Sequence, residues 1–266
     1  MRPYWSLFAT RARTLFQYRV AALAGLATQW VFGFVLTSVL VAFYGSTAAA
    51  QPMSLAQSIT YTWLGQALLG ILPWNFDREI GDGVRTGAVA YDLARPIDLY
   101  AYWYARVMAM RVAPTLLKSI PMFLIATFLM PAPFTMQWPQ LPALLAWLTS
   151  LLGALLLSCA ITLLMQVSLF WTVTGDGITR ILPHIVTLFS GMVIPLPLFP
   201  DWLQGFLRFQ PFTGVSATPS MLFTGVLPPS AIWETLALQL GWTLVFVIIG
   251  RLIMRRGLMK LTVAGG

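Results

Sequence analysis

The densest group of charged side chains in the chain lies between residues 77 and 98. Five of the eight acidic residues fall within these 22 positions, and long apolar segments flank the group on both sides. The residues that open it are Asp77, Arg78, Glu79, Gly81, Asp82 and Arg85. Side chains of both signs at this spacing offer charge-assisted hydrogen bonds to another charged surface. The group therefore indicates a contact surface in water, although a solvated loop that only fixes topology would contain the same residues.

Other kinds of chemistry find little support. The chain has one histidine and one cysteine, Cys159, so no disulfide can form within it, and a metal site would depend on carboxylates. The phosphate-binding pattern Gly-x-x-x-x-Gly-Lys-Ser/Thr is absent, as is Gly-x-Gly-x-x-Gly. No nucleophile and base occur at matched depths that would indicate a membrane-embedded enzyme. We therefore expect no metal, no cofactor bound by this chain and no ATP hydrolysis by it.

The composition of the chain indicates that most of its side chains face lipid or the protein interior and not water. The chain is 58% hydrophobic and only 9% charged, with a mean hydropathy of +0.78, whereas soluble domains contain about 25% charged residues. This predicts an integral membrane protein, and the spacing of the apolar segments predicts a single domain over residues 1–266. The excess of 16 basic over 8 acidic residues lies beside apolar segments, which favours an effect of topology over nucleic-acid binding.

The apolar segments predict an all-α protein with six transmembrane helices. The expected spans are residues 20–44, 55–74, a third that enters the membrane over residues 100–110 and ends at Met130, 144–172, a fifth that begins at Pro183, and 231–254. The first is too long for a cleaved signal peptide. In this arrangement 14 of the 16 Lys and Arg residues lie on one side, and only Arg208 lies on the other. That asymmetry predicts that both termini are cytoplasmic.

Two short helices are expected on the cytoplasmic side. In residues 4–18, one face collects Tyr4, Trp5, Phe8, Ala12, Leu15 and Phe16, and the opposite face Ser6, Thr10, Arg13 and Gln17. This predicts an amphipathic helix at the membrane interface, unless these residues are simply the first turns of a long span. In the charged group, carboxylates favour a helix N-terminus near Asp77, glycines keep the helix short or broken, and Arg95-Pro96 ends it.

Three polar residues interrupt the expected spans: Lys118, Gln166 and Glu234. An ammonium at mid-span costs about 2.5–3.5 kcal/mol on insertion scales, so Lys118 must extend to the interface, pair, or face a wet cavity. The three could line a polar pathway. The chain lacks intramembrane carboxylate pairs and inverted halves of the kind that many secondary carriers contain. His184, at the mouth of the fifth span, is assigned no chemistry.

The fifth span is followed by a segment, 195–229, that is too rich in proline to be one helix. Its candidate outer-gate residues are Pro195, Pro197, Pro200, Trp202, Pro211 and Phe212. We expect short broken helices on the outer side. If they re-enter the bilayer they must be buried in protein or line water; the alternative is an outer loop that lies flat on the headgroups.

Two of these segments resemble one family. The stretch from Asp77 to Gly87, followed by Leu93-Ala94-Arg95-Pro96, is similar to the segment between the second and third spans of ABC-2 type permeases. The stretch Ile194-Pro195-Leu196-Pro197-Leu198-Phe199-Pro200-Asp201-Trp202-Leu203, with Gln210-Pro211-Phe212 and Pro219-x-x-x-Phe223-x-Gly225, resembles the segment ahead of their sixth span. Within that superfamily, both segments resemble the small branch described as ABC-2 family transporter protein.

This resemblance implies half of a type V exporter. Residues 4–18 would form a connecting helix, residues 77–92 a coupling helix that contacts the ATPase, and the segment ahead of the sixth span re-entrant helices. Two ABC ATPase subunits, which bind ATP and Mg²⁺, would pair with this chain and a second copy or a related permease in a prokaryotic plasma (inner) membrane. A lipophilic or amphipathic cargo is expected. The alternative is a partner-independent channel or secondary carrier that uses Lys118, Gln166 and Glu234.

Overall fold

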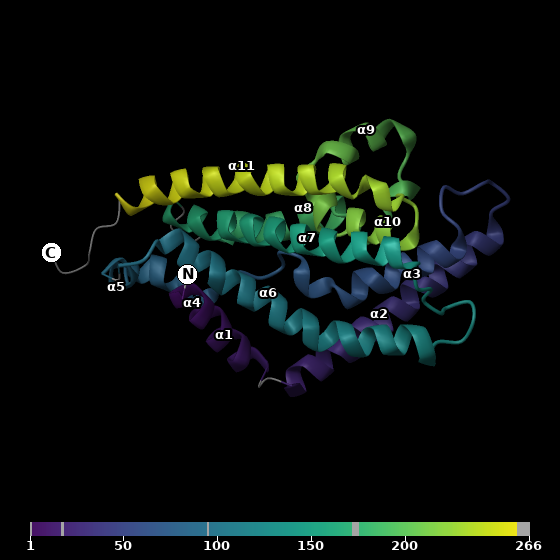
Figure 1. Ribbon diagram of the computed structural model, residues 1–266, viewed down its shortest axis with the longest axis horizontal. Helices are drawn as coiled ribbons and strands as arrows, with labels where there is room; N and C mark the ends of the chain where they lie inside the picture. Colours follow the sequence, from purple (N-terminus) through teal and green to yellow (C-terminus); the bar gives the residue numbers. More distant parts are fainter. Residues whose placement is uncertain (1, 17–18, 95, 172–175, 260–266) are drawn as a thin grey trace.

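The computed structural model of the protein describes residues 2–16, 19–94, 96–171 and 176–259. Within these ranges every regular element is helical and no strand occurs, which confirms the prediction of an all-α protein. Figure 1 shows an elongated bundle whose long helices run roughly along its length. Among the expected features, residues 174 and 175 of the turn before Arg180, together with Arg95 and Lys260, lie outside the described residues.

Four helices of the described chain are long and apolar enough to cross a membrane. They are α2 (Arg19–Ser46), α6 (Leu99–Leu124), α7 (Leu141–Ser168) and α11 (Ile232–Leu258). A π-helical turn, Ile125–Leu129, extends α6, and a 3-10 turn, Leu169–Trp171, extends α7. These helices correspond to the first, third, fourth and sixth predicted spans. The third begins at Leu99, where Asp98 caps it by accepting a 2.6 Å hydrogen bond from the Ala101 N–H.

The second and fifth predicted spans differ from the structure. Helix α3 covers only Leu55–Ala67, followed by the 3-10 turn Leu69–Ile71. Leu72 is extended, with φ −62° and ψ 144°, because the proline at position 73 disfavours a helical residue before it. The prediction that the fifth span starts at Pro183 is wrong: α8 runs Asp176–Phe189 with Pro183 buried inside it. Packing by neighbouring helices lets a membrane helix tolerate an interior proline.

The bundle has two chemically different ends (Figure 1). We call the end that carries α4 (Arg78–Thr86), α5 (Val89–Leu93) and the C-terminal part of α11 the charged end. The opposite part, which carries α9 (Asp201–Phe209) and α10 (Ala217–Thr224), is the pocket end. Helices α2, α6 and α8 run toward the pocket end, and α3, α7 and α11 run back toward the charged end.

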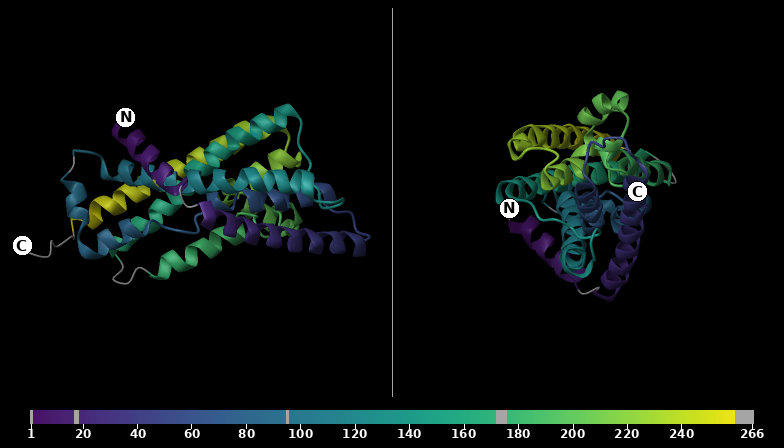
Figure 2. Two further views of the ribbon diagram at one scale, coloured as in Figure 1. Left: turned by 90° about the horizontal axis from the view of Figure 1, so that it is seen from below. Right: turned by 90° about the vertical axis from the view of Figure 1, so that its right-hand side faces the viewer.

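Helix α1 (Arg2–Phe16) is a separate element. It packs against α6, and both Figure 1 and Figure 2 show it leaving the direction of α2 at a sharp angle. The interpretation of this segment as the first turns of a long span is therefore wrong. Ala12, on the predicted apolar face, is 8% exposed, whereas Trp5 on the same face is 70% exposed. The face thus contacts α6 over only part of its length.

The proline-rich segment is broken into short helices, as predicted. The 3-10 turns Leu196–Leu198, Pro211–Val215 and Pro229–Ala231 alternate with α9 and α10. Helix α10 packs against α7 and α3 and is buried, so the segment as a whole does not lie flat on a surface. The entry turn needs Gly191, whose φ is +76° and whose missing Cβ would lie 2.6 Å from Leu196 and 2.9 Å from Ala217.

Candidate functional site

Helix α4 is built as an amphipathic helix with defined ends. The Asp77 carboxylate caps it by accepting hydrogen bonds from the backbone N–H groups of Glu79 (3.1 Å) and Ile80 (3.4 Å). Gly87, at φ +76°, closes the other end. Ile80 and Val84 are buried in a cluster that includes residues of α6, α7 and α11. Its opposite face is therefore left on the surface of the charged end.

An ion-pair network joins the N-terminus of α4 to α6 and α1. The Arg106 guanidinium of α6 donates to Asp77 Oδ2 from Nε (3.0 Å) and Nη2 (2.8 Å), and to Glu79 Oε2 (2.8 Å). Arg11 of α1 donates to both Glu79 carboxylate oxygens, at 3.0 Å to Oε1. The side chains of Arg106 and Asp77 are only 9% and 11% exposed. Three helices are thus held together by charge-assisted hydrogen bonds of the stronger kind.

Glu79 marks the rim of this network. Its side chain is 65% exposed, yet its pKa is lowered from 4.5 to about 2, mainly by the hydrogen bonds that Arg11 donates and further by those from Arg106, against a partial desolvation that acts in the opposite direction. The carboxylate therefore stays ionised throughout the physiological pH range. A fixed negative charge stands at the N-terminal end of α4, where the helix dipole favours it.

The six predicted contact residues divide by exposure. Arg78, Asp82 and Arg85 lie on the outer face of α4; the Asp82 and Arg85 side chains are 70% and 39% exposed and lie 3.7 Å apart. Asp77 turns inward to Arg106, and Gly81 packs near Phe76 and Leu169. The expected helix over residues 77–92 is two helices, because the chain turns at Gly87 before α5 begins.

Several residues of this site were not anticipated from the sequence. Arg106 and Arg111 were interpreted only as basic residues near a membrane entry, and Arg11 was not singled out. Arg111 is 3% exposed and donates to the Asn75 carbonyl (2.6 Å) and to the Thr162 hydroxyl (2.9 Å). An arginine inside a long apolar helix is a usable signal, because it requires polar partners. The spacing along the chain does not say which partners those are.

The three predicted pathway residues do not meet. Lys118 of α6 lies against α2, so close that a Cβ on Gly25 would be 2.6 Å from its Nζ. Gln166 of α7 donates to the Asp77 carbonyl at 3.4 Å, near the charged end. Glu234 of α11 pairs with Arg208 of α9 at 3.8 Å, at the pocket end. Each therefore has its own surroundings, and no shared polar contact links them.

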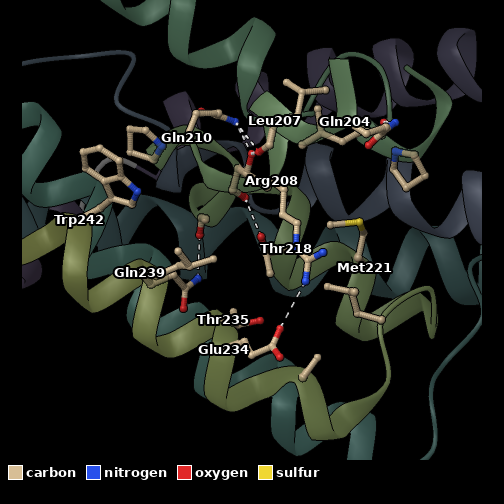
Figure 3. A pocket seen from close by; sticks show the side chains of 18 of the residues that line it. Gln204, Leu207, Arg208, Gln210, Thr218, Met221, Glu234, Thr235, Gln239 and Trp242 are labelled. Atoms are coloured by element: carbon tan, nitrogen blue, oxygen red, sulfur yellow. Dashed lines mark hydrogen bonds and ion pairs between the residues drawn. The ribbon is translucent and has the colours of Figure 1, made fainter. Parts of the chain in front are cut away.

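A pocket of about 570 Å³ lies between the proline-rich segment and α11 (Figure 3). Glu234 lines it, as do two of the predicted outer-gate residues, Pro197 and Pro211. The other four outer-gate residues do not: Pro195 is buried, Pro200 caps α9, Trp202 is 81% exposed, and Phe212 packs into the core. Gln210 anchors the wall by donating to the Phe189 carbonyl at 2.8 Å.

The fold and these two regions define a multi-pass α-helical membrane protein with a group of charged side chains at one end. No group of three or more His, Cys, Asp or Glu side chains that could hold a metal occurs among the residues that the structure describes. The sequence model of the ABC-2 family transporter proteins matches residues 34–265, and the chain therefore belongs to that family. No curated protein and no solved structure matches the chain.

The family match covers some elements of the site and not others. Helix α4, the proline-rich segment and α11 all lie inside residues 34–265, whereas α1 lies before that range. Arg11, which completes the pairing of Glu79, is thus outside the matched region. The resemblance noted from the charged and proline-rich segments is confirmed at the level of the family.

Proposed function

We propose that this chain is the permease subunit of an ABC exporter that contacts a separate ATPase through the outer face of α4. Two ATPase subunits would bind ATP and Mg²⁺, and the chain would pair with a second copy or a related permease. Membership of the ABC-2 family supports a permease role. The chain itself contains no phosphate-binding loop, so energy from ATP must come from a partner.

The observation that carries this proposal is the network around Arg106. A surface helix that only fixed topology would need no internal anchor, yet α4 is bound to α6 and α1 through Asp77 and Glu79. A displacement of α4 by a partner is therefore transmitted to α6, whose continuation as a π-helical turn ends at Leu129, near the pocket end. A rigid link of this kind is what mechanical coupling requires.

The proposed orientation puts the charged end in the cytoplasm. Among the described residues, Arg78 and Arg85 belong to α4 and Arg106 contacts it, and Arg251, Arg255 and Arg256 lie in the C-terminal part of α11 at this end. Cytoplasmic segments carry such an excess. In this arrangement α3 and α8 are the second and fifth passes, both termini are cytoplasmic, and the membrane is a prokaryotic plasma (inner) membrane.

The proposed cargo is amphipathic. The pocket at the outer side in this orientation combines apolar side chains such as Leu238 and Trp242 with the charged side chains of Arg208 and Glu234. Pockets that fix a ligand with a few polar groups over an apolar lining suit molecules with both characters. We propose that this pocket lies on the exit side of the path.

The docking of the ATPase can be tested with a matched pair of substitutions. Asp82 and Asp201 are both exposed aspartates, but Asp82 lies on α4 and Asp201 lies at the pocket end. D82K should reduce co-purification of the ATPase encoded beside this chain by about tenfold, because it reverses a charge in the contact, and D201K should leave co-purification unchanged. Glu79→Lys is less informative, because it would also break the pairing with Arg11 and Arg106.

Two results would reject the proposal. One is equal co-purification of the ATPase with the wild-type chain and with D82K. The other is full transport by the purified chain in liposomes without ATPase or ATP, which is what the alternative, a partner-independent channel or carrier, requires. The separation of Lys118, Gln166 and Glu234 gives that alternative no structural support.

A further inference from the structure

The charged residues of one long stretch all converge on the pocket. Between residues 181 and 250 the sequence contains only three Asp, Glu, Lys or Arg residues, which are Asp201, Arg208 and Glu234. They come from α9 and from the first turn of α11, and all three line the same cavity of about 570 Å³. The loop residues 47–54 and 130–140, also at the pocket end, contain no charged side chain. Charge at this end is therefore concentrated around one cavity.

Stability does not explain this concentration. The Arg208 Nη2 and Glu234 Oε2 atoms are 3.8 Å apart, too far for a hydrogen bond, and the two side chains are 72% and 78% exposed. Exposed pairs of this kind contribute about 0–1 kcal/mol. Figure 3 shows both side chains extending toward each other across the pocket from different helices. Two opposite charges are thus presented side by side without satisfying each other.

The walls of the pocket have two characters. Leu157, Leu207, Met221, Leu227, Leu238 and Trp242 provide an apolar surface. Thr235, which also lines the pocket, is 4% exposed, and Figure 3 shows its hydroxyl on the side of Glu234. The volume is within the usual range for small-molecule pockets, about 300–1,000 Å³.

We propose that this pocket binds the headgroup of a zwitterionic amphiphile, with its ammonium at Glu234 and its phosphate at Arg208. A simple anion would meet Glu234 and Asp201, and a simple cation would meet Arg208, whereas a headgroup with both charges a few bonds apart satisfies the pair together. Its apolar part would contact Leu238 and Trp242. The inference depends on the proposed function only in treating this molecule as cargo.

Binding to the full-length chain in a nonionic detergent tests the site directly. The probe is dihexanoyl phosphatidylethanolamine, and dissociation constants are measured by native mass spectrometry or calorimetry. Glu234→Gln and Arg208→Gln should each weaken binding by about tenfold or more, because each removes a charge-assisted hydrogen bond. Arg255→Gln, an exposed arginine in the last turn of α11, is the matched control and should bind as the wild type does.

Three results would overturn the site. One is the absence of saturable binding, and another is an equal loss of affinity in the Arg255→Gln control. The third is binding of dihexanoyl phosphatidylglycerol as tightly as the ethanolamine lipid, because that headgroup has no ammonium. Elution of each variant as the wild-type species in gel filtration ensures that a loss of binding is local. Thr235→Val, which removes only one hydroxyl of the pocket wall, should weaken binding severalfold.

The source of the ligand and the proposed function are tested separately. If the ligand is cargo, then ethanolamine lipid added to the complex with its ATPase should stimulate ATP hydrolysis, and Glu234→Gln should shift that stimulation to higher lipid concentration. Equal stimulation of wild type and variant rejects cargo at this site. Binding by the isolated chain does not involve the ATPase, so loss of ATPase docking would reject the proposed function and leave the headgroup site intact.

Discussion

The two ends of the bundle each present an arginine and a carboxylate from different helices, and the pairs differ in burial. Arg106 and Asp77, at the charged end, lie 2.8 Å apart and are 9% and 11% exposed. Arg208 and Glu234, at the pocket end, lie 3.8 Å apart and are 72% and 78% exposed. Breaking a buried pair leaves an uncompensated charge, whereas solvent screens an exposed one. The same two residue types therefore hold helices together at the charged end and are accessible to a ligand at the pocket end.

Helix packing is also tighter at the charged end than at the pocket end. At the charged end α4 rests on a buried cluster that includes Trp103 and Val167. At the pocket end α9 and α11 are separated by the pocket itself. One end is suited to transmit displacement, and the other to accept a molecule.

The largest effect should come from Arg106→Ala. This substitution leaves the Asp77 carboxylate buried without a cation and should lower the free energy of unfolding by about 3–5 kcal/mol. The matched change Arg208→Ala should lower it by less than about 1 kcal/mol. Denaturant titration of both variants in micelles measures the difference. Equal losses would remove the distinction between the two ends.

An intermediate effect is expected from two glycines of the pocket end that share one conformation. Gly191 and Gly225 have φ values of +76° and +74°, so alanine strains the backbone at both by about 1–2 kcal/mol. Only at Gly191 would the added Cβ also meet neighbours, at 2.6 Å from Leu196. The free energy of unfolding of G191A should therefore be lower than that of G225A by about 1–3 kcal/mol.

The same unfolding titration gives this comparison. If G191A and G225A lose equal stability, then the turn after α8 is looser than the structure indicates, and the pocket wall that it positions is not rigid. If G191A also weakens binding of the ethanolamine lipid while G225A does not, then the turn sets the geometry of the pocket.

The smallest effect should be the pH dependence that Glu79 contributes. Its pKa is lower in the folded chain, about 2, than the ordinary value of 4.5. The stabilisation is therefore complete above about pH 4.5 and is lost as the pH falls toward 2. The fall in unfolding midpoint between about pH 6 and pH 3 should be smaller in Glu79→Gln than in the wild type. Because the side chain is 65% exposed, the difference is modest.

Arg11→Met gives the control for this assignment. It removes the first cause of the lowered pKa and should reduce the acid sensitivity in the same direction as Glu79→Gln. An unchanged pH profile in both variants would mean that the pairing of Glu79 contributes no more to stability than a solvent-exposed ion pair. The pairing of Glu79 with Arg11 would then stabilise the fold as little as the exposed pair at the pocket end, and less than the buried pair of Arg106 and Asp77.

Much of the fold was predictable from the sequence because apolar length and proline content act locally. The long helices, the separate α1 and the broken segment after α8 follow from such patterns. The length of α3 and the start of α8 were not predicted, because Pro73 ends one helix early while Pro183 is tolerated inside the other. The same residue type has opposite effects, and the packing around it decides which occurs.

The candidate sites were predictable in residue type but not in role. The segment from Asp77 to Arg85 was identified as a surface, yet the structure turns Asp77 inward to Arg106, which is 29 positions away in the chain. Glu234 was identified as a polar residue of a span, but its partner Arg208 was considered only as a basic residue on the outer side. Pairings between distant segments depend on the tertiary arrangement, which local patterns do not encode.

The burial of α3 has a consequence for biosynthesis. Residues 58–67 of this helix are all buried, and they include the polar side chains of Ser58, Thr60, Thr62 and Gln66. During translation α3 emerges before α6, α7 and α10, the helices that later surround it together with α2. We expect that it cannot settle alone in hydrocarbon and stays beside α2 at the insertion machinery until those helices arrive. The order of synthesis then sets the order of assembly. Helix α3, whose buried polar side chains suit lipid poorly, enters the bundle only when the later helices pack around it.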